Sequence, residues 1–207
     1  MIMLECWLPA LAAYALFLAW YQNWRGPLSR AEVDAFMAEA EAQDAGKNND
    51  LDIVRAFLEK DDGREFVMLN LVRVAPGLVP DPETGTPTQG RVLMNRYSTP
   101  FIKRLILRGG HPAIVARKVG GYVDAWHVAP DPGWTIMGYM RYRSRRDMAK
   151  LAFDPRFRDI HKFKIAGTAE TFSFPTQPML TLFVGPRVWV PLTLALMAAL
   201  ANLAVIA

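Results

Sequence analysis

Hydrophobic residues are concentrated at the two ends of the chain. Residues 1–24 contain one charged side chain, Glu5, and the run from Cys6 to Tyr21 contains none. Residues 188–207 contain no charged side chain. A helix rises about 1.5 Å per residue, so segments of this length can cross the roughly 30 Å hydrocarbon core of a bilayer. The pattern predicts one transmembrane helix over residues 1–24 and a second over residues 186–207.

Aromatic residues flank the first apolar segment. Trp7 stands near one end, and Trp20, Tyr21 and Trp24 stand near the other. This arrangement is typical of the two aromatic belts of a spanning helix, with packing in a protein core as the alternative. A cleaved secretory signal fits less well, because neither a basic residue before the apolar run nor a small-residue cleavage motif after it is present.

The distribution of positive charge predicts the topology. All 24 Lys and Arg residues lie between Arg25 and Arg187, and the formal net charge is +4. Basic segments next to membrane helices stay on the cytoplasmic side. We therefore expect a two-helix protein of a bacterial inner membrane, with the central domain in the cytoplasm and both termini in the periplasm. The basic composition then needs no nucleic acid to explain it.

Residues 25–64 predict a helical N-terminal extension. Ser29 and Glu32 have the spacing of a capping box, and apolar residues follow at helical intervals. Asp50 is a typical N-cap for a second, shorter helix, which the sequence 61–63 (Asp-Asp-Gly) ends.

Residues 65–178 predict an α+β domain. The continuous apolar run 66–74 (FVMLNLVRV) indicates a central, buried strand. The elements expected after it are a helix beginning at Thr99-Pro100, strands over 111–119 and 134–143, helices after Ser144 and after Asp154-Pro155, and a short strand over 171–174. This βαββαβ order predicts a ferredoxin-like sandwich of four antiparallel strands with two helices on one face. The side chains expected in its core are Phe66, Met68, Leu71, Phe101, Leu105, Ile136 and Phe157.

Residues 75–91 separate the first strand from the first helix. Four prolines and three glycines in this segment argue against regular structure and predict a long loop. A lid, a partner contact and a mobile surface segment are the three roles open to it.

The sequence offers few residues for catalysis or metal binding. The single cysteine, Cys6, excludes an internal disulfide and a cysteine-ligated metal centre. The three histidines, His111, His127 and His161, are far apart in the chain and have no dense carboxylate cluster beside them. No phosphate-binding loop or nucleophile motif is present. We therefore predict no catalytic residue, no metal site and no resident cofactor.

Basic residues form three clusters within the domain. They are Lys103, Arg104 and Arg108; Arg141, Arg143, Arg145 and Arg146; and Arg156, Arg158, Lys162 and Lys164. A solvated face, an acidic protein partner and anionic lipid headgroups are the alternatives for them. Tyr139 and Tyr142 lie among the second cluster, as in surfaces that stack single-stranded nucleic acid, but we expect no nucleic-acid partner.

Several motifs resemble those of the dimeric α+β barrel superfamily, and within it a bacterial family of unknown function. They are the strand 66–73, the turn 108–112 (RGGHP), the strand 134–143, and the segment 144–147 (SRRD) leading to 154–157 (DPRF). The resemblance covers about residues 51–178. The long loop after the first strand and the two membrane helices are additions that soluble members lack.

The resemblance implies further properties. Some relatives bind haem through a helix histidine, which makes His161 the cofactor-binding candidate here, with Trp126 and His127 as secondary candidates. Other relatives use a cavity between sheet and helices for cofactor-free chemistry. Members of the superfamily also pair their sheets, so a homodimer through the sheet is a further expectation.

Two functions follow from these patterns. The leading hypothesis is a non-catalytic accessory subunit of a bacterial inner-membrane complex of respiratory or photosynthetic type, whose partners are other integral membrane subunits. Small residues at Ala12, Ala13 and Ala15, and at Ala195, Ala198 and Ala199, provide helix faces suited to close packing. The alternative is a membrane-tethered enzyme, or a small-ligand or haem binder, that uses the barrel cavity.

The topology can be tested with a reporter fused after Ala207. Because all Lys and Arg residues lie between the two apolar ends, we expect a periplasmic alkaline phosphatase reporter to be active there and a cytoplasmic fluorescent reporter to be dark. The reverse result would show that the C-terminus faces the cytoplasm.

Overall fold

The computed structural model describes residues 2–180 and 184–206, without the side chains of residues 2–4, 156, 158 and 206. The chain divides into two compact units. One unit is Arg25–Gln177, and the other combines Met1–Trp24 with Pro178–Ala207. The terminal residues of both predicted membrane segments, Met1 and Ala207, lie outside the described residues.

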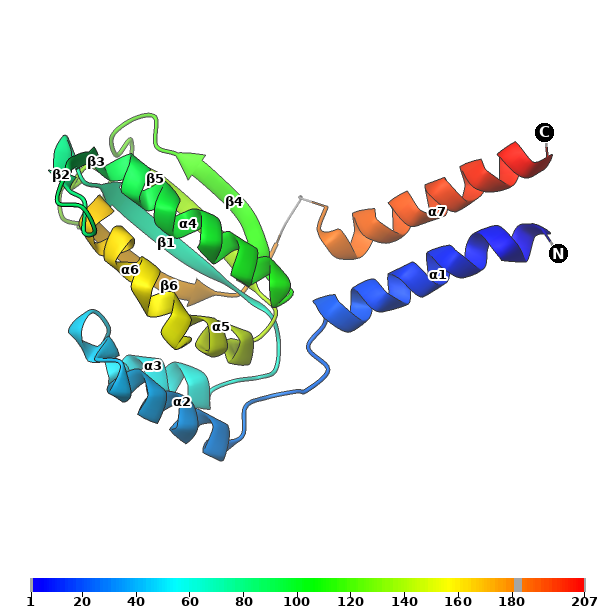
Figure 1. The fold of residues 1–207 in the computed structure, drawn as a ribbon, viewed down its shortest axis with the longest axis horizontal. Coiled ribbons are helices and arrows are strands. Elements are labelled where there is room, and N and C mark those ends of the chain that lie inside the picture. Colours follow the sequence, from blue (N-terminus) through cyan, green and yellow to red (C-terminus); the bar gives the residue numbers. More distant parts are fainter. Residues whose placement is uncertain (1, 181–183, 207) are drawn as a thin grey trace. The chain divides into compact units, whose positions relative to one another are not determined.

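A four-stranded antiparallel sheet forms the centre of the unit Arg25–Gln177 (Figure 1). Its strands are β1 (Phe66–Val74), β4 (His111–Arg117), β5 (Ile136–Tyr142) and β6 (Thr168–Thr176), in the spatial order β4-β5-β1-β6. All neighbouring strands run antiparallel. The predicted α+β fold with an antiparallel sheet is confirmed, and the first strand has the predicted bounds.

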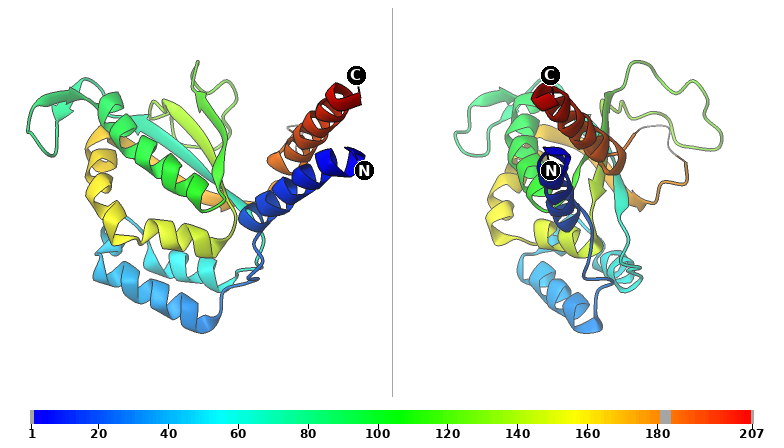
Figure 2. Two further views of the ribbon diagram at one scale, coloured as in Figure 1. Left: turned by 45° about the vertical axis from the view of Figure 1, so that its right-hand side comes forward. Right: turned by 90° about the vertical axis from the view of Figure 1, so that its right-hand side faces the viewer.

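Three helices cover one face of this sheet (Figures 1 and 2). They are α4 (Gly90–Leu107), α5 (Arg145–Ala152) and α6 (Pro155–Gly167). Phe66, Leu105 and Phe157 are each at most 2% exposed and form a core cluster with Tyr142 and Leu151, so their predicted burial is confirmed. Met68 and Phe101 are partly buried against the same cluster.

The opposite face of the sheet differs from the prediction. Phe66 and Met68 alternate with Leu69 and Leu71 along β1, so the two pairs lie on opposite faces. The helices cover the face of Phe66, whereas Leu71 lies on the other face and is only partly buried. The prediction that Leu71 belongs to the core was therefore wrong, because an apolar run on both faces of a strand does not require both faces to be covered by the same chain.

The N-terminal helices extend the helical layer. They are α2 (Arg30–Ala42), the short 3₁₀ helix η1 (Ala45–Lys47) and α3 (Leu51–Glu59). The predicted capping box is present: the Glu32 amide donates to Ser29 Oγ, and the Ser29 amide donates to Glu32 Oε2. Asp50 caps α3 as predicted. The apolar faces of α2 and α3 meet α5 in a second core cluster, formed by the buried residues Val33, Met37, Leu58 and Ala149.

A buried arginine connects the N-terminal segment to α5. Arg146 has a side chain 5% exposed and binds Glu32 with two hydrogen bonds, Nε to Oε1 at 2.8 Å and Nη2 to Oε2 at 3.1 Å. Its remaining donors reach the carbonyl oxygens of Gly26 at 3.0 Å and Pro27 at 2.8 Å. The Arg146 guanidinium, with the Ser29 amide, lowers the pKa of Glu32 from 4.5 to about 2. All three nitrogens of the guanidinium thus have partners within the unit.

Both ends of this unit are held at one turn, residues 61–63. The Leu28 amide donates to Asp61 Oδ2 at 2.8 Å, and the Gln177 amide group donates to Asp62 Oδ2 at 3.0 Å. Gly63 has a φ of +74°, and a Cβ there would lie 2.9 Å from the backbone nitrogen of Pro27, so the close contact requires glycine. The two chain segments that lead to the other unit therefore leave from the same place.

The segment 75–91 contains a short hairpin, contrary to the prediction of no regular structure. Strands β2 (Leu78–Pro80) and β3 (Pro87–Gln89) pair antiparallel. The Asp81 carboxylate accepts hydrogen bonds from the backbone amides of Glu83 and Thr84 in the turn. It also forms an ion pair with Arg96, with 2.5 Å between Oδ2 and Nη1. Because a two-stranded ribbon leaves one edge of each strand free, prolines at its ends cost little.

Helix α4 begins nine residues before the predicted start at Thr99. Pro100 lies inside the helix, where it removes one backbone hydrogen bond without ending the helix. Leu93, Tyr97, Phe101 and Leu105 follow at intervals of four and share the buried side. Packing of this side against the sheet outweighs the local cost of proline.

The ends of the other three strands of the sheet differ slightly from the prediction. Strand β6 is longer than the predicted 171–174, β4 ends before Lys118, and β5 begins after Thr135. The Thr135 amide instead donates to the carbonyl oxygen of Val72.

The second unit contains two helices that pack against each other, α1 (Ile2–Tyr21) and α7 (Pro186–Ile206). Arg187 donates to Gln22 Oε1 at 3.0 Å and lies over the Tyr21 ring. Among the described residues, one helix is long and apolar enough to cross a membrane: Pro186–Val205, with a mean hydropathy of 2.0. The prediction of one span at each end is thus supported at the C-terminal end alone.

Replacing Arg146 tests the buried connection. Arg146→Met removes the buried guanidinium from the Glu32 carboxylate and from two carbonyl oxygens, and we expect a loss of about 2 to 4 kcal/mol in the free energy of unfolding. Arg55→Met is the matched control, because Arg55 pairs with Asp34 at the surface and should contribute less than about 1 kcal/mol. Equal losses in urea denaturation of the two variants would contradict this account.

Candidate functional site

The three predicted cofactor-binding candidates lie in different parts of the domain. His161 is on α6, on the helix-covered side of the sheet, whereas Trp126 and His127 belong to the segment between β4 and β5. Trp126 is 76% exposed, and its indole N–H donates to Asp124. His127 has a φ of 53°, in the left-handed region. No ring contact or hydrogen bond in the described chain joins His161 to either of them.

His161 lies among aromatic side chains between α6 and α4. Its ring stacks on Tyr97, with centroids 5.6 Å apart, and meets the edge of Phe157 at 5.4 Å. Burial in these surroundings, with a smaller effect of the Lys164 charge, lowers the pKa of His161 from 6.5 to about 4. The imidazole is therefore neutral at physiological pH.

Two more polar groups belong to this cluster, and we call Tyr97, His161 and Lys164 together the α4–α6 polar cluster. Lys164 Nζ lies 5.6 Å from the centre of the Tyr97 ring. Burial lowers the pKa of Lys164 and raises that of Tyr97. Tyr97 was not among the residues predicted from the sequence. Its spacing of four from Phe101, and the spacing of three between His161 and Lys164, were the available signals.

Metal binding has no support in the described part of the chain. Within it, no group of three or more His, Cys, Asp and Glu side chains comes close enough to hold an ion.

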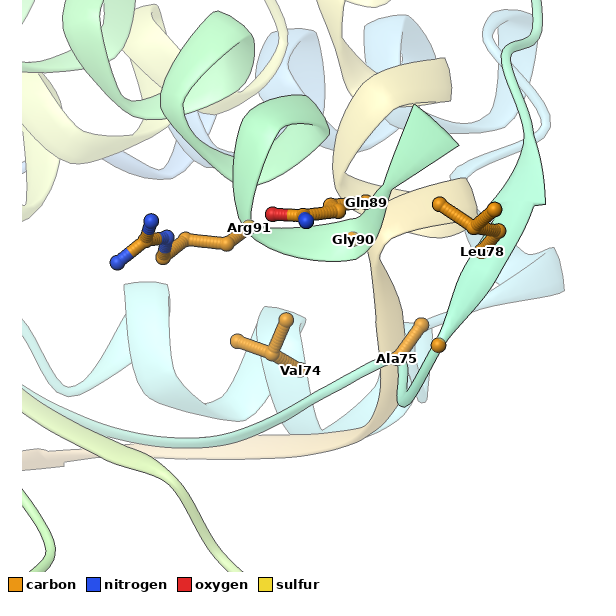
Figure 3. A pocket seen from close by; sticks show the side chains of 7 residues that line it. Val74, Ala75, Leu78, Gln89, Gly90 and Arg91 are labelled. Carbon is orange, nitrogen blue, oxygen red and sulfur yellow. The ribbon is translucent and has the colours of Figure 1, made fainter. Parts of the chain in front are cut away.

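A shallow pocket lies at the start of α4 (Figure 3). It has a volume of about 360 Å³ and is lined by Val74, Ala75, Gly77, Leu78, Gln89, Gly90 and Arg91. Among the described residues that line it, Arg91 has the one charged side chain.

The basic cluster at residues 141–146 is used inside the domain. Arg141 pairs with Glu65 and donates to the carbonyl oxygen of Gly109. Arg143 binds Asp147 with two hydrogen bonds of 2.8 Å. Arg145 contacts Asp61 and donates to the Phe57 carbonyl oxygen, and Arg146 is the buried residue described above. These four residues therefore make contacts within the domain.

The other two clusters are partly paired. Arg104 and Arg108 lie 3.9 and 3.6 Å from the Asp154 carboxylate. Lys162 pairs with Glu83 at 2.8 Å. Arg156 and Arg158 belong to the residues whose side chains are not described.

The side of the sheet opposite α4, α5 and α6 carries apolar side chains from all four strands, and we call it the open sheet face. Strand pairing places two apolar rows across all four strands: Ile114, Tyr139, Leu69 and Phe174 in one, and Ala116, Met137, Leu71 and Phe172 in the other. Phe172 and Phe174 are 44% and 45% exposed and stack on each other. None of the described helices of this unit covers the face (Figure 2).

The segment between β4 and β5 adds to the open sheet face at one end. Trp134 packs edge-on against Phe172 with centroids 5.2 Å apart, and its indole N–H donates to the Tyr122 hydroxyl at 3.0 Å. Charged residues at the rim are paired: Arg73 with Glu170, and Lys118 with Asp131. The face is therefore apolar and electrically balanced.

Comparison with known proteins shows the fold only. No protein-family model matches the chain, and no curated protein matches it. A crystal structure of a protein of unknown function from Rhodopseudomonas palustris matches with 22% identity and a TM-score of 0.51, covering 65% of this chain and 97% of that one. The methylated form of that protein matches with 21% identity and a TM-score of 0.52, covering 66% and 96%. Nearly the whole of that protein thus shares its fold with about two thirds of this chain.

The burial of His161 predicts its titration. In an NMR titration of protein labelled with ¹³C-histidine, the His161 ring should keep the chemical shift of neutral imidazole until the pH falls towards about 4. The unfolded chain takes up this proton near pH 6.5, so the folded state loses stability from this group as the pH falls from 6.5 to 4. A His161 midpoint at or above pH 6.5 would contradict the burial of the neutral ring.

Proposed function

We propose that this protein is a non-catalytic accessory subunit of a bacterial inner-membrane complex. In this role α1 and α7 anchor it among other integral membrane subunits, and the domain Arg25–Gln177 binds a partner subunit through the open sheet face. The open sheet face carries the proposal, because a monomeric soluble domain rarely leaves so many aromatic and aliphatic side chains uncovered on one surface.

The composition of α1 and α7 supports membrane anchoring. Beyond the length and hydropathy of α7, helix α1 has 20 residues with a single charged side chain, in its first turn. Leu11 and Leu16 of α1 are 61% and 72% exposed, and Leu192 of α7 is 63% exposed, as expected of side chains that face lipid or neighbouring helices.

Small residues support contact with other membrane subunits. On α1, the residues Ala12, Ala13 and Ala15 are exposed, while Ala198 of α7 is buried. Exposed alanines allow a neighbouring helix to approach closely, which favours packing between membrane helices. We place the partner subunits against this side of α1.

The charge balance favours a protein as the occupant of the open sheet face. Nucleic acid requires unpaired cations near its phosphates, and the rim cations Arg73 and Lys118 already pair with Glu170 and Asp131. Anionic lipid headgroups have the same requirement. An apolar face with a balanced rim resembles the centre of a protein–protein interface. A second copy of this chain is the alternative protein occupant, as expected from a homodimer through the sheet.

Native electrophoresis of membranes solubilised in mild detergent tests the proposal. We expect the full-length protein to migrate in an assembly that contains other polypeptides, and Phe172→Glu to release it because a carboxylate would enter the apolar contact. Ile53→Glu is the matched control, since Ile53 is 67% exposed on α3, away from the sheet. The control variant should stay in the assembly.

Two results would contradict the proposal. A wild-type protein that migrates alone, as a monomer, would leave a tethered enzyme or small-ligand binder as the better account. A wild-type homodimer free of other polypeptides would assign the open sheet face to a second copy instead.

A further inference from the structure

The segment between β4 and β5 carries an exposed apolar tip. Val119, Val123, Trp126 and Val128 are between 62% and 102% exposed, and we call these four residues the β4–β5 tip. The segment projects away from the sheet (Figure 2, right). In the chain alone these large apolar side chains lie in water, which is unfavourable for them.

Contacts at its base hold the segment in place. Lys118 pairs with Asp131, and the Lys118 amide donates to the Thr135 carbonyl oxygen at 3.0 Å. The Trp134 indole N–H donates to the Tyr122 hydroxyl at 3.0 Å. Because the base is fixed, the tip loses less conformational freedom on binding than a free loop would lose.

The composition of the tip suits the interface between a bilayer and water. Trp126 and the neighbouring Tyr122 are residue types that are enriched there. The Trp126 indole N–H donates to the Asp124 carboxylate, so the ring can leave water without an unpaired donor. Asp124 is the one charged residue in the segment 119–130. A carboxylate and an irregular backbone must stay hydrated, so the composition fits the headgroup region and not the hydrocarbon core.

A bilayer fits the tip better than a protein partner does. The centre of a protein interface is a closely packed patch, whereas Val119 and Val123 are almost wholly exposed and stand apart. Insertion among lipids depends on the apolar area and needs no complementary shape. Anchoring by α7 would also keep the domain beside a bilayer, so that insertion becomes an intramolecular step.

We propose that the β4–β5 tip inserts into the headgroup region of the bilayer that holds α7. The tip lies at the end of the sheet away from the turn 61–63, where the two linkers leave the domain. The domain is then held to the membrane at two places, through its linkers and through the tip. The inference rests on the membrane anchoring in the proposed function, and not on the partner at the open sheet face.

Quenching of a fluorophore by labelled lipid tests the insertion. The full-length protein with Cys6→Ser and Val123→Cys is labelled with nitrobenzoxadiazole and placed in phosphatidylcholine nanodiscs that contain a doxyl lipid quencher near the headgroup. Ile53→Cys in the same background is the matched control, because Ile53 is exposed on α3. Since interfacial segments enter about 5–10 Å into the headgroup boundary, we expect at least about twofold stronger quenching at position 123 than at position 53.

Two further samples test what drives the insertion. Val119→Ser and Trp126→Ser, added to the Val123→Cys protein, should lower its quenching to the level of the control. Quenching that persists in this variant would show that the fluorophore inserts by itself, and would overturn the proposal. Because the segment between Lys118 and Arg141 contains no Lys or Arg, phosphatidylglycerol should not be required. Quenching that occurs only with phosphatidylglycerol would assign the contact to basic residues elsewhere and would also overturn it.

The outcomes separate this inference from the proposed function. A protein that does not enter nanodiscs would overturn both the membrane anchoring and the insertion of the tip. A protein that enters them, with equal quenching at positions 123 and 53, would overturn the insertion alone. Purified nanodiscs contain no other polypeptide, so a fluorophore at position 123 that is shielded only in native membranes would assign the tip to a protein partner instead.

Discussion

The ion pair between Arg146 and Glu32 is the interaction on which the shape of the domain depends. A guanidinium with a side chain 5% exposed is costly to bury, and it is tolerated here because a carboxylate and two backbone carbonyl oxygens accept its hydrogen bonds. Glu32 is also the N3 residue of the capping box that begins α2. One contact therefore fixes the start of α2, the path of the preceding backbone and the position of α5.

Both ends of the domain are held at the same turn, which suits the proposed anchoring in a membrane. The turn 61–63 holds Leu28 through Asp61 and Gln177 through Asp62, so both ends of the domain are fixed at one place on its surface. In the helix pair, Arg187 likewise joins the start of α7 to Gln22, just after α1. Strand β1 begins beside the turn 61–63, and the segment between β4 and β5 lies at the other end of the sheet. The two chain segments that leave the domain, beside Leu28 and Gln177, therefore start from one place and not from separate places on the open sheet face.

Much of the fold could be predicted from the sequence because its signals are local. Ser29, Asp50 and Ser144 cap helices as expected, and the apolar run 66–74 is a strand.

The start of α4 could not be predicted, because Pro100 is a local signal for a helix start and the packing that overrides it comes from the sheet. The internal role of the basic cluster 141–146 could not be predicted either, because its carboxylate partners Glu32, Asp61 and Glu65 are distant in sequence. Tyr97 and His161 come together only when α4 packs on α6, so no sequence motif could indicate the α4–α6 polar cluster. Leu71 of the open sheet face was predicted to lie in the core, because an apolar strand gives no sign of whether its second cover comes from the same chain.

Photo-crosslinking in living cells tests the central claim most directly. A benzoylphenylalanine placed at Phe174 reports what lies on the open sheet face, and the same residue placed at Ile53 of α3 is the control. The account predicts a crosslink from position 174 to a different membrane-associated polypeptide and none from position 53. A crosslink from position 174 only to a second copy of this chain, or no crosslink at all, would contradict it.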